Sequence, residues 1–220
     1  MVECHDAGLP SMKDAWFYLT LGITLGFAAA VQPGPLLTYI ISQTLKNGWR
    51  STLPAAFAPL VSDIPIATVI LLILSQVPAW LVQALRLAGG FFLLYLAYGA
   101  FKTWQNFAEY KPETVQSGGQ SLLKAATVNW LNPGPYLGWS LILGPLFLKG
   151  WRETPANGVA ILVGFYASMV ASMIGVIILF SYARNLGARI NRAMIGLTAI
   201  ALAGFGVYQI WSGVSALWWK

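Results

Sequence analysis

The amino-acid sequence predicts an all-α integral membrane protein whose six transmembrane helices form a 3+3 inverted repeat. Three observations lead to this prediction: an apolar composition, long stretches without charge, and one Pro-Gly-Pro motif in each half of the chain. Hydrophobic residues make up 57% of the 220 positions, and charged residues only 9%. A soluble domain has roughly 45–50% apolar and about 25% charged residues, so this chain lacks the charged surface that a soluble fold requires.

Four long stretches of the chain carry no charged residue, and each lies between two charged positions: Asp14 and Lys46, Lys124 and Lys149, Glu153 and Arg184, and Arg192 and Lys220. Each stretch is longer than the roughly 20 residues that an α-helix needs to cross a bilayer. An open sheet would leave backbone polar groups unpaired in lipid, so spans that are apolar on all sides are expected to be helices.

We expect six spans, at residues 15–45, 52–75, 79–101, 125–148, 155–182 and 193–217. The chain then divides into a polar N-terminal tail (1–14), a first three-helix repeat (15–101), a linker (102–124), a second three-helix repeat (125–217) and a C-terminal tail (218–220). The linker holds the one sizeable polar stretch of the sequence. A functional lid is the alternative interpretation of that stretch.

The two halves of the chain resemble each other in sequence. Two motifs align at an offset of 100 residues: Gln32-Pro33-Gly34-Pro35 and Asn132-Pro133-Gly134-Pro135. The segments 45–50 and 148–152, each with a Lys, a Trp and an Arg, then align as well. Because each repeat has an odd number of spans, the second copy crosses the membrane in the opposite direction, as in many secondary transporters.

The distribution of positive charge predicts the orientation of the spans. Eight Lys and Arg residues follow the first, third and fifth spans, and five lie on the other side. Positively charged loops favour the cytoplasmic side, so both termini are expected outside. The Lys and Arg residues of segments 45–50 and 148–152 have an alternative role, since cations stabilise helix C-termini.

A Pro-Gly-Pro motif inside a span breaks the helix and exposes backbone groups. The prolines remove two donors, which frees the carbonyl groups four residues earlier, on Ala29 and Val31 in the first span and on Asn129 and Leu131 in the fourth. The restarted helix presents unpaired N–H groups. Donors for a carboxylate and carbonyls for an ammonium group together suit a zwitterion. The alternative is a packing kink whose polar groups are satisfied by neighbouring helices.

The candidate substrate-binding residues surround these two breaks: Gln32, Pro33, Gly34, Pro35, Asn129, Asn132, Pro133, Gly134, Pro135 and Tyr136. Gln32 and Asn132 occupy equivalent positions before the breaks. Their amide side chains either bind the substrate or cap the restarted helices, and the sequence favours neither.

Asp63 is the one acidic residue within an expected span. A carboxylate at bilayer depth costs at least ~2.5 kcal/mol and marks a functional site by default. We therefore expect Asp63 to load and release protons or to bind a substrate amine. A structural ion pair with Arg86 is the alternative, although Arg86 lies near a span end and can reach the membrane interface.

Several other functions and ligands have little support in the sequence. With one cysteine, Cys4, and one histidine, His5, the chain has no internal disulfide and no set of metal ligands. It has no motif of an enzyme, so we expect no catalytic residue and no cofactor. Its cations are scattered, which argues against nucleic acid. Gly22 and Gly26 permit close helix packing, either within the monomer or across a homodimer.

The chain resembles the lysine- and threonine-exporter superfamily from about residue 15 to 217. The similarity lies in the first Pro-Gly-Pro motif, the segment 46–50, Asp63 in the second span, and the segments 130–133 and 136–137. It implies a six-span exporter of amino acids and related solutes in the prokaryotic inner membrane, driven by protons. It also implies that the functional motif positions are Pro33, Gly34, Pro35, Asp63, Asn132 and Pro133.

The expected function is therefore export of a small polar solute, foremost an amino acid or a derivative, coupled to proton entry. Two residues differ from the family pattern: Leu36 replaces a common polar residue, and Gly138 replaces an acid found in exporters of basic amino acids. These differences motivate two alternatives. One is a membrane scaffold or assembly factor without transport, and the other is an exporter of a less polar solute on the same fold.

Overall fold

The computed structural model describes residues 12–73, 79–107, 117–184 and 187–218, and within these ranges the secondary structure is helical, without strands. In chain order the elements are α1 (Met12–Val31), α2 (Pro35–Asn47), α3 (Trp49–Thr52), the 3-10 turn η1 (Leu53–Phe57), α4 (Ala58–Ile73), α5 (Ala79–Gln105), α6 (Gly118–Trp130), α7 (Pro133–Gly138), the π-helical turn η2 (Trp139–Leu143), α8 (Gly144–Glu153), α9 (Pro155–Arg184) and α10 (Ala188–Trp218). The expected tails fall largely outside the described residues.

Four helical segments of the described chain are long and apolar enough to cross a membrane: Trp49–Leu72, Gln83–Gln105, Pro155–Arg184 and Ala188–Ser215. The pair Ala15–Val31 and Pro35–Asn47, bent by 63°, makes a fifth if it forms one span. The segment expected as a fourth span is divided among α6, α7, η2 and α8. The protein is thus an all-helical, multi-pass membrane protein.

The two Pro-Gly-Pro motifs sit at helix boundaries of different shape. In the first half, α1 ends at Val31 and α2 begins at Pro35, with Gly34 in an extended conformation and no side-chain cap. In the second half, α6 ends at Trp130 and α7 begins at Pro133, so Gly134 lies inside α7 rather than in the gap. Proline suits both helix starts because the first helical N–H has no partner in the helix.

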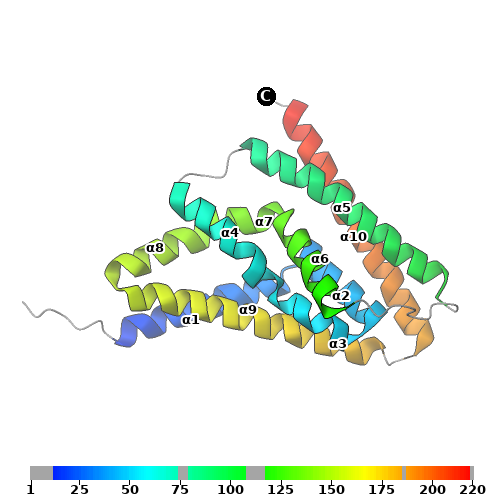
Figure 1. The fold of residues 1–220 in the computed structure, drawn as a ribbon, viewed down its shortest axis with the longest axis horizontal. Helices are drawn as coiled ribbons and strands as arrows, with labels where there is room; N and C mark the ends of the chain where they lie inside the picture. Colours follow the sequence, from blue (N-terminus) through cyan, green and yellow to red (C-terminus); the bar gives the residue numbers. More distant parts are fainter. Residues whose placement is uncertain (1–11, 74–78, 108–116, 185–186, 219–220) are drawn as a thin grey trace, which may run out of the picture.

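Helices from the two halves of the chain lie side by side. In Figure 1, α1 and α9 run together along one edge, α5 and α10 pair along another, and α2, α3, α4 and α6 lie between them. A Cβ atom on Gly22 or Gly26 would meet the backbone of Ile161 or Phe165 in α9. These two glycines therefore serve packing inside the monomer, whereas Gly138 faces open space.

The predicted linker is helical at both ends. Helix α5 continues to Gln105, and α6 begins at Gly118 after Ser117, whose hydroxyl accepts a hydrogen bond from the Gln120 N–H at 3.3 Å. Residues 108–116 of the expected linker lie outside the described residues. Lys124, which the sequence places in the linker, is instead half-buried on α6.

We predict that Gly26→Leu destabilises the protein. The added side chain meets the backbone of Phe165, which cannot turn away, and such overpacking costs about 1–3 kcal/mol. The matched control is Gly175→Leu on α9, where a Cβ meets nothing within 4 Å. Thermal unfolding of the detergent-purified variants measures the difference, and equal melting temperatures would contradict the packing of α1 against α9.

Candidate functional site

Asp63 lies at the centre of a buried polar cluster that joins α4, α6 and α9. Its side chain is 3% exposed. The Asn129 amide donates to Asp63 Oδ1 at 3.0 Å, and the Tyr166 hydroxyl donates to Oδ2 at 3.3 Å. These contacts place an acid from the first half of the chain between two polar residues of the second half.

Ser62 holds the Asn129 amide in position. The Ser62 hydroxyl donates to the carbonyl of Ala58 at 3.0 Å, as serines in membrane helices commonly do. Its oxygen then accepts a hydrogen bond from the Asn129 amide at 2.7 Å. Because Asn129 donates to both Ser62 and Asp63, its orientation is set from two sides.

Trp139 completes the cluster, and sequence reasoning did not identify it. The indole lies beside Asp63 and Tyr166 and is 4% exposed. Its N–H has no hydrogen-bond partner among the described residues. Trp139 begins η2, and π-helical turns occur frequently at functional sites. A signal was present, since Trp139 lies inside an expected span rather than at its end.

Arg86 does not pair with Asp63, which was the alternative role that the sequence suggested for these two residues. Its guanidinium group donates to the carbonyl of Ser212 at 3.4 Å, where α5 packs on α10. Among the described residues, the side chains that donate hydrogen bonds to Asp63 are Asn129 and Tyr166, and both are neutral. The ion pair between Asp63 and Arg86 is therefore not formed in this structure.

The residues around the second helix break, between α6 and α7, form hydrogen bonds with one another. Asn132 caps α7, because its side-chain oxygen accepts from the Gly134 N–H at 3.1 Å. The Tyr136 hydroxyl donates across the break to the carbonyl of Trp130 at 3.1 Å. The carbonyl of Asn129 accepts from the Asn132 N–H at 3.3 Å, so the expectation that this carbonyl is free was wrong. The chain turns tightly enough after α6 to satisfy it.

The residues around the first break do not join the Asp63 cluster in the same way. Gln32 and Pro33 are exposed, Gly34 is half-buried and Pro35 is buried. Within the described residues, the Gln32 side chain makes no hydrogen bond to Asp63, Asn129 or Tyr166. Among the predicted site residues, the structure thus brings together Asp63 and Asn129, which are joined by a hydrogen bond.

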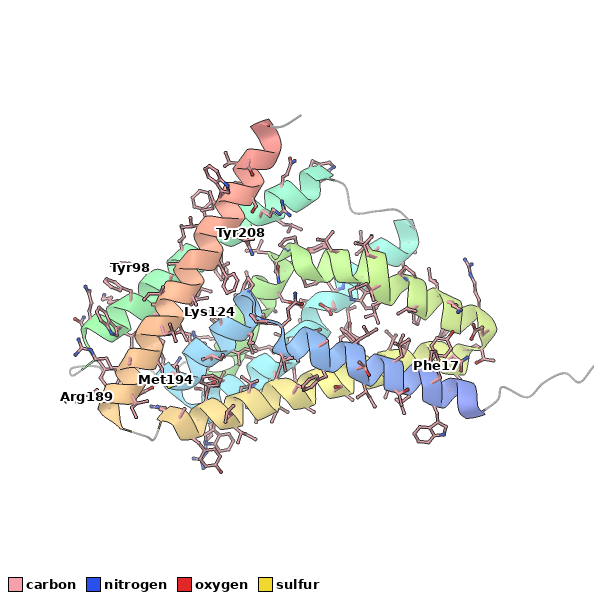
Figure 2. All side chains as sticks on the ribbon, turned by 180° about the vertical axis from the view of Figure 1, so that it is seen from behind. Phe17, Tyr98, Lys124, Arg189, Met194 and Tyr208 are labelled. Atoms are coloured by element: carbon pink, nitrogen blue, oxygen red, sulfur yellow. The ribbon has the colours of Figure 1, made fainter. Side chains whose placement is uncertain are left out.

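A polar cavity of about 490 Å³ lies between α2, α5, α6 and α10. It shares α6 with the Asp63 cluster, and two lysines, Lys46 and Lys124, line it. Neither lysine was a candidate site residue in the sequence. Figure 2 shows Lys124 between α10 and α2, on the side of the molecule that also holds Arg189, with Phe17 on the opposite side.

Comparison with known proteins gives a consistent result over most of the chain. A family model described as LysE type translocator matches residues 27–213. Proteins named arginine exporter protein ArgO are similar over 136 residues, at 30% identity in Klebsiella pneumoniae (strain 342) and 28% in Escherichia coli (strain K12) and Shigella flexneri. The match covers 59% of this chain and 63% of each relative, which is less than two thirds of their length. No solved structure matches the chain.

We predict that Asn129→Ala lowers the free energy of unfolding by about 1–3 kcal/mol, because it removes a donor from a buried carboxylate. Thr127→Ala is the control on the same helix, since the Thr127 hydroxyl bonds back to Leu123 and takes no part in the cluster. Thermal unfolding of both variants provides the comparison. If Asn129→Ala is tolerated as well as Thr127→Ala, Asn129 does not hold Asp63.

Proposed function

Because this chain belongs to the LysE type translocator family, we propose that it is a secondary active exporter of a small polar solute, foremost an amino acid or a derivative, in the prokaryotic inner membrane. The members of this family are translocators rather than enzymes. The relatives named as arginine exporters support an amino acid as the solute class. We propose further that proton entry drives export through Asp63.

The proposal that Asp63 couples transport to protons is supported mainly by its burial and by its neutral hydrogen-bond partners. Asn129 and Tyr166 stabilise the charged form by donating to it, and no cation in the described part of the chain is bonded to it. A protonated Asp63 keeps these contacts, because a hydroxyl can turn and accept from the acid proton. Both protonation states are therefore compatible with the same packing, as a carrier of protons requires.

We propose that the chain crosses the membrane six times and that these spans form two inverted repeats, with α1 to α5 as the first and α6 to α10 as the second. The relation between two corresponding loops supports this arrangement. The first loop contains Gly48, which packs against the side chain of Arg184 at the C-terminal end of α9. The second contains Arg152 and directly precedes Pro155 at the N-terminal end of α9. A helix of 30 residues is about 45 Å long, so the loops lie at opposite ends of a membrane span.

The topology can be tested with single cysteines. In a Cys4→Ser background, Arg50→Cys and Arg152→Cys should react with a membrane-impermeant thiol reagent from opposite sides of the membrane, since both positions are exposed. The proposed orientation places Arg50 inside and Arg152 outside. Labelling of both residues from one side would contradict the inverted repeat.

The function is tested by counter-flow of labelled amino acids in proteoliposomes with purified protein, followed by the variant Asp63→Asn. We predict that wild-type protein accumulates solute when a proton gradient is imposed, and that Asp63→Asn abolishes this accumulation while exchange down the solute gradient survives. Asparagine keeps the size of the side chain, and the Tyr166 hydroxyl can turn to accept from its amide. The variant therefore tests whether a proton on residue 63 is needed, while the packing around this residue is kept.

Glu153→Gln is the matched control for Asp63→Asn. Glu153 also accepts a hydrogen bond from a tyrosine, Tyr18, at 2.9 Å, but it is exposed at the end of α8. Its replacement should leave gradient-driven accumulation within about twofold of wild type, because an exposed interaction contributes little. Accumulation by Asp63→Asn would exclude Asp63 as the coupling site. A folded wild-type protein without counter-flow of any amino acid would favour the scaffold alternative.

A further inference from the structure

The polar cavity between α2, α5, α6 and α10 has an unusual charge distribution for a site inside a membrane protein. Lys46 comes from the last turn of α2 and Lys124 from the middle of α6, and both are half-buried. Both lysine side chains line this one cavity. The cavity-lining residues that the structure describes include no acid to neutralise them.

Besides the two lysines, the cavity lining contains a neutral hydrogen-bond donor. Tyr39 is among the residues that line the cavity, its side chain is 1% exposed, and its hydroxyl has no hydrogen-bond partner among the described residues. Lys46 uses one of its three donors on the carbonyl of Gly99, at 3.4 Å. Two like charges and a buried donor without a partner are costly unless an anion occupies the space between them.

We propose that this cavity binds the carboxylate of the exported solute between Lys46 and Lys124. This inference rests on the proposed export function and specifies its substrate class. A volume of about 490 Å³ falls within the roughly 300–1,000 Å³ of small-molecule sites. The ammonium groups supply charge-assisted donors, and Tyr39 supplies a neutral donor to the second carboxylate oxygen.

The position of the cavity connects binding to the proposed coupling site. Lys124 and Asn129 lie five residues apart on α6, which corresponds to about 7.5 Å along the helix axis. A solute held by Lys124 is therefore about 1.4 helical turns from Asn129, which donates to Asp63 from another face of α6. Lys46 lies in the last turn of α2, next to the loop that contains Gly48 and Arg50, and this loop is cytoplasmic in the orientation that we propose.

The two lysines also select against a second positive charge on the solute. A side-chain ammonium or guanidinium group in the same cavity would face Lys46 and Lys124 without an acid beside it. The site therefore favours neutral or acidic amino acids over arginine, the solute named for the relatives. The structure thus assigns a different solute preference to this member of the family.

Counter-flow in proteoliposomes tests the proposal, with alanine and aspartate as carboxylate probes and ethylamine as the decarboxylated form of alanine. We expect alanine or aspartate, but not ethylamine, to compete with the labelled amino acid. Arginine should compete at least tenfold more weakly. Loss of one charged donor should raise the half-saturation concentration about tenfold in Lys46→Gln and in Lys124→Gln. The control Lys102→Gln, an exposed lysine on α5 outside the cavity lining, should change it less than twofold.

The outcomes separate the two proposals. If wild-type protein transports no amino acid, both the proposed export function and this inference are wrong. Wild-type protein that transports amino acids but accepts ethylamine equally, or whose lysine variants match Lys102→Gln, overturns the inference alone. The assay is run in phosphatidylcholine vesicles with and without phosphatidylglycerol, and variant effects confined to the anionic vesicles would assign the site to a lipid headgroup. The competition experiment uses wild-type protein, so it tests carboxylate binding even if a lysine variant fails to fold.

Discussion

The hydrogen bonds of the buried Asp63 carboxyl group determine how the rest of the molecule must be arranged. A charge at bilayer depth costs at least ~2.5 kcal/mol, and Asn129 and Tyr166 offset this with neutral donors. Asp63 comes from the first half of the chain and both donors from the second half, so α4, α6 and α9 must meet around one side chain. Close packing elsewhere, above all where Gly22 and Gly26 meet α9, brings the helices into that position.

The second helix break contributes to the same site. Helix α6 ends at Trp130 and α7 restarts at Pro133, and the hydrogen bonds of Asn132 and Tyr136 close the gap between them. The break places Asn129 before the turn and Trp139 after it, and both reach the Asp63 cluster. In a membrane, where water cannot satisfy free backbone groups, such a break persists only if the protein itself supplies the partners.

The sequence predicted the helical class and the buried position of Asp63 because both depend on the rarity of charge, which is visible without a structure. It also named Asn129 as a candidate, and the structure shows that its amide donates to Asp63. Trp139 was missed because a tryptophan in an apolar span has many packing roles, and only the tertiary structure places its N–H beside an acid. Lys124 was assigned to a linker because the polar segment around it conceals that α6 begins at Gly118.

The central claim is that Asp63 gains and loses a proton as the protein transports its solute. Infrared difference spectroscopy of reconstituted protein, recorded with and without solute and repeated with Asp63→Asn, measures this directly. We predict a protonated-carboxyl band that changes when solute is added to wild-type protein and is missing from the variant. A carboxyl spectrum that is the same in both proteins and does not respond to solute would contradict it.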